Sequence, residues 1–552
     1  MTTTTPLDFF YHWEAKTPDH PYLRQPINDE WKVTTYGAAG VEIRKLAAAL
    51  KGLGLPPKTA IAILSKNCAH WFMADLAIMM AGYVSVPLYP TLSAAGVRQI
   101  LEHSESKVVF IGKLDNYEAQ RSAIPEDLIR ISFPYYGPNE GIGWKDLIAL
   151  QAPLKGNPHY STDELATIMY SSGTTGTPKG VMLSFGALGF VGECVSRHLQ
   201  VTKPERFFSY LPLSHIAERA MVEMVVLASG STVSFAESLD KFAENLAHEQ
   251  PTLFGGVPRI WSKFQEGVLA KIPQSKLSLL LSIPIVGGII RKSIRKKLGM
   301  SKARVIVSGA APIPMNLLLW YKKLGIVIQE MYGLTENTAF SHAAYNGVKL
   351  GTVGQPWPEV ECKLDESGEL LVRHPALMQG YFKDKETTAS VFTADGFLKT
   401  GDLGMIDHEG FLTITGRARD QFKTDKAKFV APAPIEMKLL SNQDIEQVCV
   451  VGTGIPLPIA LVVLSKTGRS KPKEALIREI IATVENINST AEDYERLAKV
   501  VVMNEEWTVE NGLMTPTLKI KRGELEKLYL PRYPEWYANK DTVIWQNDEE
   551  KG

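Results

Sequence analysis

The feature that most constrains the fold is a regular alternation of strand-like and helix-like segments between residues 36 and 111. The apolar, strand-like segments are 59–64, 83–88 and 108–111. Helix-like segments precede and separate them: 36–56, with apolar Val41, Leu46 and Leu50, then 71–81 and 97–103. Strands that alternate with helices at this spacing predict a parallel sheet with helices on both faces, in which ligands bind beyond the carboxyl ends of the strands.

The chain has 552 residues, which is too long for a single hydrophobic core. After residue 416 charged residues become denser, and strand-like segments 447–451 and 460–464 precede a helix-like segment at 473–487. We therefore predict an α/β protein with two domains. Residues 1–416 form a large N-terminal domain of doubly wound sheets with helices, and residues 417–552 form a small α+β domain.

Composition excludes several classes of function. Lys plus Arg equals Asp plus Glu, at 60 each, so no global field attracts nucleic acid. The four cysteines are far apart and contain no Cys-x-x-Cys pair, which argues against a zinc site and fits a reducing compartment. We found no secretory signal and no apolar run long enough to span a membrane. These observations predict a cytoplasmic protein.

A loop rich in hydroxyl groups and glycine, residues 170–180, follows an apolar strand-like run. Its glycines let the backbone approach a ligand closely, while its amides, hydroxyls and Lys179 can bind the oxygens of a polyphosphate. The order differs from the common nucleotide-binding loop, since no Ser or Thr follows the lysine. The alternative for such a composition is a flexible surface loop.

Three further motifs each permit a structural and a functional interpretation. The small residues Gly309, Ala310 and Ala311 follow a strand-like segment and leave space for a flat ring, or they form a tight turn. A second strand-like segment at 326–330 leads to Glu336, which is a plausible magnesium ligand or a favourable residue at a helix start. The small turn 400–402 places Asp402 where it can accept hydrogen bonds from a ribose diol.

Basic residues complete the set. Arg417 lies shortly after Asp402 and can bind phosphate or hydroxyl oxygens in a fork. Lys519 lies in a polar segment near the C-terminus, which could equally be a solvated basic tail. Each of these motifs is weak evidence alone, but their order along the chain is specific.

In this order the motifs resemble those of the adenylate-forming enzymes, which include acyl-CoA synthetases, luciferases and nonribosomal adenylation domains. The resemblance covers residues from about 8 to about 530. Segments 211–215, 297–304 and 513–519 are most similar to long-chain fatty acid–CoA ligases. The resemblance implies that ATP and Mg²⁺ activate a fatty acid as acyl-adenylate, and that the C-terminal domain then rotates so that coenzyme A accepts the acyl group. The alternative is transfer to an acyl carrier protein or another acceptor.

The resemblance also assigns roles to individual residues. It implies catalytic roles for Lys519, Thr335, Glu336 and His215, and metal binding by Glu336 and Thr174. It places Arg419 at the domain hinge. The residues implied to bind ATP are Thr174, Thr175, Gly176, Thr177 and Lys179 for the phosphates, Gly309, Ala310, Ala311, Tyr332 and Gly333 for the adenine, and Asp402 and Arg417 for the ribose.

The chain departs from the family in one loop. Where family members usually carry Thr-Ser-Gly-Gly-Lys, residues 424–428 read Thr-Asp-Lys-Ala-Lys, so both glycines are missing. This loop borders the path of the pantetheine thiol in the family. Either the loop has another conformation or the thioester-forming state is less populated, or the loop needs only one small residue, which Ala427 supplies while Lys426 points to solvent. We hypothesise that the second half-reaction, not the first, is limiting.

The region 271–300 interrupts the alternation. Its apolar segment 278–290 is followed by Arg291, Lys292, Arg295, Lys296 and Lys297. One interpretation is an insertion whose apolar face packs on the domain, followed by a solvated basic helix. The other interpretation is that residues 278–297 form a patch that contacts the inner face of a membrane peripherally. The sequence does not determine the oligomeric state or the acyl chain length.

Overall fold

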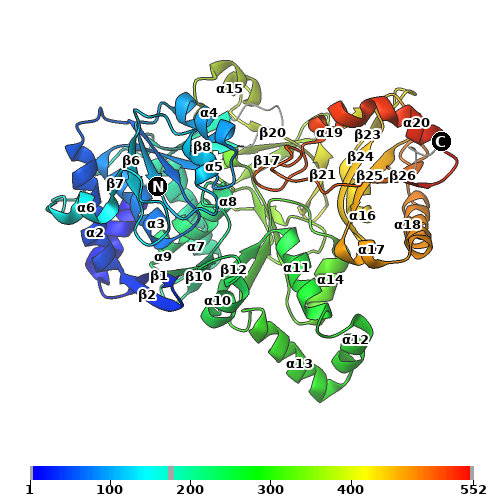
Figure 1. Cartoon of the computed structure of the whole chain (residues 1–552), viewed down its shortest axis with the longest axis horizontal. Helices are drawn as coiled ribbons and strands as arrows, with labels where there is room; N and C mark the ends of the chain where they lie inside the picture. Colours follow the sequence, from blue (N-terminus) through cyan, green and yellow to red (C-terminus); the bar gives the residue numbers. More distant parts are fainter. Residues whose placement is uncertain (1–3, 172–178, 547–552) are drawn as a thin grey trace.

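The computed structural model describes residues 4–171 and 179–546 (Figure 1). Its centre is an eight-stranded sheet in which β3, β4, β5, β6, β7 and β8 are parallel and β9 and β19 complete one edge. Along the sheet the strands are β19 (Gly380–Tyr381), β9 (Lys179–Ser184), β8 (Leu165–Ser171), β4 (Val84–Leu88), β3 (Ala60–Leu64), β5 (Val108–Ile111), β6 (Ile129–Ser132) and β7 (Ile142–Gly143).

Both faces of this sheet are covered, as the sequence predicts. Ile61 and Ile63 of β3 join a core that includes α2 (Tyr36–Gly52) and α3 (Ala69–Ala81). The alternate residues Ala60, Ala62 and Leu64 join a second core with α4 (Ala94–Ser104). Because successive side chains of a strand point to opposite faces, this division shows directly that helices pack on both sides. The α/β fold class is therefore confirmed.

The helix α3 is buried along its whole length. It lies between the central sheet and a second sheet, which explains why 71–81 lacks a polar face in the sequence. The strands of the second sheet are β10 (Arg206–Ser209), β11 (Thr232–Phe235), β1 (Pro21–Ile27) and β2 (Glu30–Thr35). One apolar residue of α2 differs from expectation. Val41 is exposed, whereas Leu46 and Leu50 are buried.

Two further sheets carry most of the predicted site residues. The first contains β12 (Leu253–Gly256), β13 (Val305–Ser308), β14 (Gln329–Tyr332), β15 (His342–Ala343) and β16 (Gln355–Pro356). The second contains β17 (Glu361–Leu364), β18 (Glu369–Arg373), β20 (Leu398–Ile406) and β21 (Leu412–Arg417). The strand predicted at 326–330 thus begins three residues later, so that Tyr332 ends the strand.

The C-terminal part has hydrophobic cores of its own, built from residues between Phe422 and Ile544. Its four-stranded sheet contains β24 (Ile445–Val451), β25 (Ile459–Leu464), β26 (Lys499–Val502) and β27 (Val543–Trp545), packed with helices that include α16 (Pro432–Leu439), α18 (Lys473–Asn488) and α19 (Arg522–Tyr529). Figure 1 shows this part beside the N-terminal part. The predicted boundary at 416/417 falls at the end of β21 and remains a prediction.

Several polar contacts join the two parts. Arg259 of α11 (Pro258–Leu269) forms ion pairs with Glu446 and Glu506, at 3.1 and 3.4 Å. The side chain of Asn316, in α14 (Met315–Lys323), donates to the backbone carbonyl of Ser441 at 2.8 Å. Exposed ion pairs of this kind contribute at most about 1 kcal/mol each. These contacts can therefore hold one arrangement without preventing others.

Candidate active site

The predicted phosphate loop joins β8 to the antiparallel β9. Because β8 runs parallel to β4, its carboxyl end lies at the edge of the sheet where ligands of α/β proteins bind. Lys179 begins β9, and its ammonium lies 5.1 Å from the centre of the Tyr381 ring. The loop residues Thr174, Thr175, Gly176 and Thr177 lie outside the described residues.

The predicted adenine turn follows β13. Ala310 has a left-handed backbone, with φ of 67°, and Ala311 is exposed. A side chain at Gly309 would lie 3.2 Å from the carbonyl oxygen of Met331 in the neighbouring strand β14. At Gly333, just after β14, an added Cβ would lie within 2.6 Å of the backbone of Ala339. The small residues therefore allow close packing of the backbone here, and their role in framing a ring remains a prediction.

Asp402 links three of the predicted nucleotide-binding residues. Its carboxylate accepts a hydrogen bond from the Tyr332 hydroxyl at 2.6 Å and pairs with Arg417 Nε at 2.9 Å. The segment 400–402 is not a turn, as the sequence suggested, but part of strand β20, in which Gly401 has a φ of 72°. Asp402 pairs with Arg417 across β20 and β21, which brings them together despite their separation in sequence.

Glu336 lies in a short 3-10 helix, Thr335–Asn337, just after β14. The Tyr381 hydroxyl donates to Glu336 Oε1 at 3.0 Å, and no hydrogen bond to the second carboxylate oxygen is seen within residues 4–171 and 179–546. Within the described residues no cluster of three or more His, Cys, Asp or Glu could hold a metal ion by itself. A single carboxylate that acts together with substrate phosphates fits Mg²⁺, which keeps several other ligands.

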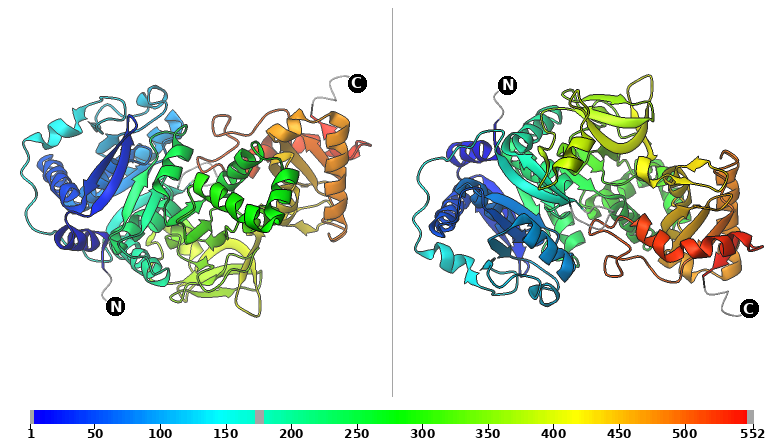
Figure 2. Two further views of the ribbon diagram at one scale, coloured as in Figure 1. Left: turned by 90° about the horizontal axis from the view of Figure 1, so that it is seen from below. Right: turned by 90° about the horizontal axis from the view of Figure 1, so that it is seen from above.

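Lys519 reaches this group from the C-terminal part. The charges of Arg417, Asp402, Glu336 and Arg419 all act on its ammonium. Crowding by protein atoms, followed by the positive charge of Arg417, lowers the pKa of Lys519 to about 8, although the side chain remains accessible to solvent. Figure 2 shows the brown segment that leads to α19 extending from the C-terminal part toward the N-terminal part.

The turn that presents Lys519 is well supported. The backbone amide of Lys519 donates to Thr515 Oγ1 at 3.1 Å, and the preceding residue, Leu518, has a φ of 60°. Three residues later, Arg522 pairs with Glu436 of α16 at 2.5 Å. This anchor ties the lysine turn to the core of the C-terminal part. Lys521 precedes α19 as its N-cap and therefore does not continue an extended strand with Lys519.

His215 is the N-cap of a short helix, Ile216–Glu218. Its Nδ1 accepts a hydrogen bond from the amide of Ala217 at 3.2 Å, so that in the neutral ring the proton is on Nε2. Burial, and then the nearby charge of Lys519, lower the pKa of His215 to about 3. The ring is therefore neutral at pH 7 and can donate one hydrogen bond from Nε2.

A buried charge network begins four residues after His215, at Arg219, whose backbone amide donates to the carbonyl of His215 at 3.3 Å. Arg219 begins a π-helix, Arg219–Met224, and pairs with Asp75 of α3 at 2.5 Å. Its guanidinium also donates to Thr167 of β8, the strand that leads into the phosphate loop, at 2.8 Å. Arg219 thus connects the histidine segment to that strand through groups that are completely buried.

The predicted hinge and the loop that departs from the family sequence both follow β21 closely in the chain. Arg419 occupies a short 3-10 helix, Ala418–Asp420, after β21. The loop 424–428 joins β22 (Phe422–Lys423) to β23 (Phe429–Val430), and Ala427 in it has a φ of 58°. The position where the family has glycine thus has a left-handed backbone here, without a glycine to relieve it.

Sequence reasoning missed Tyr381. Its hydroxyl binds Glu336 and its ring lies near Lys179, so it joins the predicted metal and phosphate sites. The residue lies in a two-residue strand that pairs with β9, and nothing in its local sequence indicates this role. The lining residues of the acyl chain were not predicted individually from the sequence.

Comparisons with known proteins agree with this geometry. The family model described as AMP-binding enzyme matches residues 10–382, and that described as AMP-binding enzyme C-terminal domain matches residues 420–541. A long-chain-fatty-acid–CoA ligase of Mycobacterium bovis is 31% identical, with 93% of each chain covered. The peroxisomal long chain acyl-CoA synthetase 6 of Arabidopsis thaliana is 28% identical, covering 98% of this chain and 86% of the relative.

Solved structures show the same fold at lower identity. The adenylation domain of a carboxylate reductase from Mycobacterium chelonae has a TM-score of 0.81 at 23% identity and covers 98% of this chain and 92% of that chain. The o-succinylbenzoate CoA synthetase of Bacillus subtilis, with its acyl-adenylate intermediate, has a TM-score of 0.73 at 23% identity and covers 94% of this chain and 97% of that chain.

Proposed function

Because this chain belongs to the AMP-binding enzyme family, we propose that it activates a long-chain fatty acid with ATP and transfers the acyl group to coenzyme A. The family membership predicted from the order of the motifs is thereby confirmed. The observation that carries the proposal is the meeting of Lys519 with Glu336, Asp402 and Arg417, since these residues come from both parts of the chain.

The first half-reaction follows from this arrangement. A carboxylate oxygen of the acid attacks the α-phosphorus of ATP, and pyrophosphate leaves with the electrons of the broken bond. Negative charge builds up at the α-phosphate, and the Lys519 ammonium would stabilise it there. His215 Nε2–H orients the carboxylate as a neutral donor. Thr335 contacts the α-phosphate.

In this proposal the nucleotide is bound by side chains that can form hydrogen bonds beyond those they already make within the protein. Among the described residues, the two oxygens of Asp402 have one partner each, the Tyr332 hydroxyl and Arg417 Nε, which leaves lone pairs for a ribose hydroxyl. Arg417 holds this carboxylate in place while binding the ribose. Thr174, Thr175, Gly176, Thr177 and Lys179 bind the phosphates, and Gly309, Ala310, Ala311, Tyr332 and Gly333 frame the adenine. Mg²⁺, held by Glu336 with Thr174, would neutralise phosphate charge.

In the second half-reaction the thiol sulfur of coenzyme A attacks the acyl carbonyl carbon and AMP leaves. Arg419 is the hinge about which the C-terminal part rotates to admit the thiol. The loss of glycines at 424–428 favours one alternative, in which an acyl carrier protein or another acceptor takes the acyl group. We retain coenzyme A because Ala427 already adopts the left-handed backbone that the loop requires. The scattered cysteines favour a cytoplasmic location.

Pyrophosphate release over a panel of carboxylic acids tests this function. We expect release with long-chain acids in the absence of any thiol, and acyl-CoA formation only when coenzyme A is added. Lys519→Ala should remove most pyrophosphate release but leave transfer from supplied acyl-adenylate largely intact. Release that requires short or aromatic acids would overturn the substrate class, and transfer only to a carrier protein would establish the alternative acceptor.

A further inference from the structure

Two helices in the region 271–300 form a hairpin that extends away from the rest of the chain. These are α12 (Gln274–Ser282) and α13 (Pro284–Lys297), which project at the bottom of Figure 1. The basic residues lie on the same helix as the second half of the apolar segment, not on a separate helix after it. The expectation that the apolar segment 278–290 packs on the domain holds only for residues such as Leu281 and Ile290, which are partly buried against a core that Leu277 and Ile294 join from either side of the segment.

The solvent-facing side of the hairpin is apolar near the connection between the helices. Ile285 is 80% exposed and Ile289 is 64% exposed, although both are large aliphatic residues. Leu279 and Ile283 extend the same patch with exposures of 65% and 43%. Four neighbouring aliphatic residues at such exposure are unusual on a surface that only meets water.

Positive charge follows on the same face of α13. Positions 285, 289, 292 and 296 share one side of a helix, because their spacing is three or four residues. Ile285 and Ile289 are thus continued by Lys292 and Lys296, which are both exposed. Between residues 267 and 329 the chain contains eleven Lys and Arg and no Asp or Glu. A protein that is neutral as a whole therefore concentrates cations around this hairpin.

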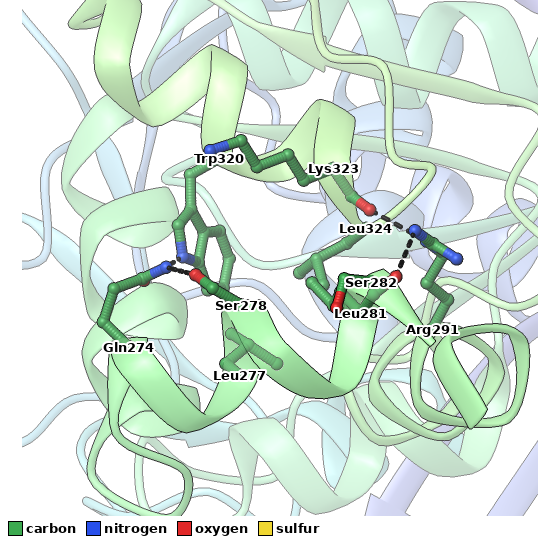
Figure 3. Close-up of a pocket in the computed structure, with 9 residues that line it drawn as sticks. All are labelled: Gln274, Leu277, Ser278, Leu281, Ser282, Arg291, Trp320, Lys323 and Leu324. Carbon is green, nitrogen blue, oxygen red and sulfur yellow. Dashed lines mark hydrogen bonds between the residues drawn. The ribbon is translucent and has the colours of Figure 1, made fainter. Parts of the chain in front are cut away.

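The hairpin is held firmly against α14. Arg291 Nε donates to the carbonyl of Lys323 at 2.9 Å, and Trp320 Nε1 donates to Gln274 Oε1 at 3.0 Å (Figure 3). A cavity of about 280 Å³ lies between the three helices and is lined by both apolar and cationic side chains, among them Leu277 and Lys323. None of the predicted catalytic residues lines it. Since α14 follows the adenine turn, the hairpin is connected to the active site by a single helix.

We propose that the α12–α13 hairpin is a docking surface for an anionic lipid bilayer. The exposed aliphatic residues enter the boundary between headgroups and acyl chains, while Lys292, Lys296 and neighbouring lysines bind lipid phosphates. No helix of the described residues is long and apolar enough to cross a membrane, so this contact is peripheral. The inference goes beyond the proposed reaction and does not depend on which acid is activated.

Charge complementarity selects the occupant. A protein partner would present acidic side chains at fixed positions. The lysines of this surface have flexible side chains and are spread over the two helices of the hairpin and α14. Such an array suits a surface of uniform negative charge better than a specific epitope. The residues that connect the two helices are apolar, and the second half of α13 is basic. This order matches a bilayer surface, in which the apolar acyl chains lie beneath the charged headgroups.

Vesicle flotation of the full chain tests the proposal. One set of vesicles contains phosphatidylcholine alone, and the other also contains about 30% phosphatidylserine, which gives the negative surface of an anionic membrane. We expect binding only to the anionic vesicles, weakened by salt. A variant with Lys276, Lys292, Lys296, Lys297 and Lys323 changed to Gln should bind at least about tenfold more weakly. Ile285→Ser with Ile289→Ser should also weaken binding, at unchanged net charge.

A matched control changes five exposed lysines elsewhere to Gln: Lys51, Lys155, Lys385, Lys399 and Lys466. It alters net charge equally and should bind as the unmodified protein does. Pyrophosphate release in the absence of vesicles should be unchanged in every variant, because none of these residues lies in the active site. Equal loss in the control, or no loss in the hairpin variants, would overturn the proposal. Self-association that disappears with the serine variant, without any vesicle binding, would assign the patch to a second copy instead.

Discussion

The lowered pKa of Lys519 gives a direct test at the scale of one residue. Only the ammonium form can stabilise charge at the α-phosphate, so kcat/KM for pyrophosphate release should be high below pH 8 and fall above it. The fall should follow the loss of one proton. In kcat the fall should occur at higher pH, because bound triphosphate favours the ammonium. Initial rates between pH 6 and pH 10 measure both.

Lys519→Arg is the matched variant for this profile. Its guanidinium stays charged throughout that range, so the fall near pH 8 should disappear even if activity is lower overall. Lys521→Arg should keep the fall, since Lys521 is the N-cap of α19 and not the residue assigned to the site. A fall that persists in Lys519→Arg and vanishes in Lys521→Arg would move the assignment by two residues.

Tyr381 should act as a positioning residue for Glu336. Tyr381→Phe keeps the ring near Lys179 but removes the hydroxyl that holds the carboxylate. We expect the Mg²⁺ concentration for half-maximal activity to rise about tenfold, with little change in kcat at saturating Mg²⁺. Tyr332→Phe is the control, because it removes the hydroxyl that donates a hydrogen bond to Asp402. It should raise the KM for ATP without changing the Mg²⁺ requirement. An unchanged Mg²⁺ profile in Tyr381→Phe would contradict this role.

At the scale of elements, the sequence predicted local structure better than it predicted contacts. Strands 59–64, 83–88 and 108–111 and their helices were found because buried parallel strands are short apolar runs with clear breaks. By contrast, 400–402 was taken for a turn, because a left-handed glycine inside strand β20 has the same composition as a turn. The partners of Tyr381 and Arg219 could not be predicted, since they depend on tertiary pairing between distant strands and helices.

The loop 424–428 should control the second half-reaction. Ala427 pays about 1 kcal/mol for its left-handed backbone, so the loop has less freedom to approach the thiol path than a glycine loop. Ala427→Gly should accelerate decay of acyl-adenylate on addition of coenzyme A by roughly fivefold, and leave its formation unchanged. Single-turnover measurements separate the two steps.

Lys426→Gly is the control for this loop. It adds backbone freedom one residue earlier, but Lys426 is not among the left-handed residues, so no strain is relieved. We expect little acceleration of decay. Equal acceleration by both variants would show that flexibility, rather than strain at Ala427, limits transfer. Decay that is already much faster than formation in the unmodified protein would refute the idea that transfer is limiting.

The buried network around Arg219 should dominate the stability of the segment that carries His215. Arg219→Met leaves Asp75 and Glu223 buried without their cation, which should destabilise the N-terminal part by about 3–5 kcal/mol. The midpoint of urea unfolding should fall accordingly. Arg197→Met, on the exposed side of α7 (Phe185–His198), should cost less than about 1 kcal/mol. Restoration of the midpoint by adding Asp75→Leu to Arg219→Met would show that the unpaired carboxylate is the cause.

At the scale of the whole molecule, the proposed function assigns the described arrangement to the adenylation step. Lys519 lies within the electrostatic reach of Glu336, Asp402 and Arg417, the last residue of β21, while in loop 424–428 the backbone amide of Asp425 donates to the carbonyl of Ile455 in the C-terminal part. The sequence could predict the two groups of motifs but not their relative placement, because that depends on weak polar contacts between the parts. Acyl transfer would require these contacts to break.

Arg259 provides the test of that balance. Its ion pairs with Glu446 and Glu506 join the two parts, and both pairs are partly exposed, so together they favour this arrangement by at most about 2 kcal/mol. Arg259→Ala should therefore slow acyl-adenylate formation severalfold and accelerate its transfer to coenzyme A by a similar factor, in rapid-quench single-turnover experiments. Arg373→Ala removes an exposed pair with Glu361 within one sheet and should change neither step. If Arg259→Ala slows both steps alike, the residue contributes to the site itself, and the balance between arrangements is set elsewhere.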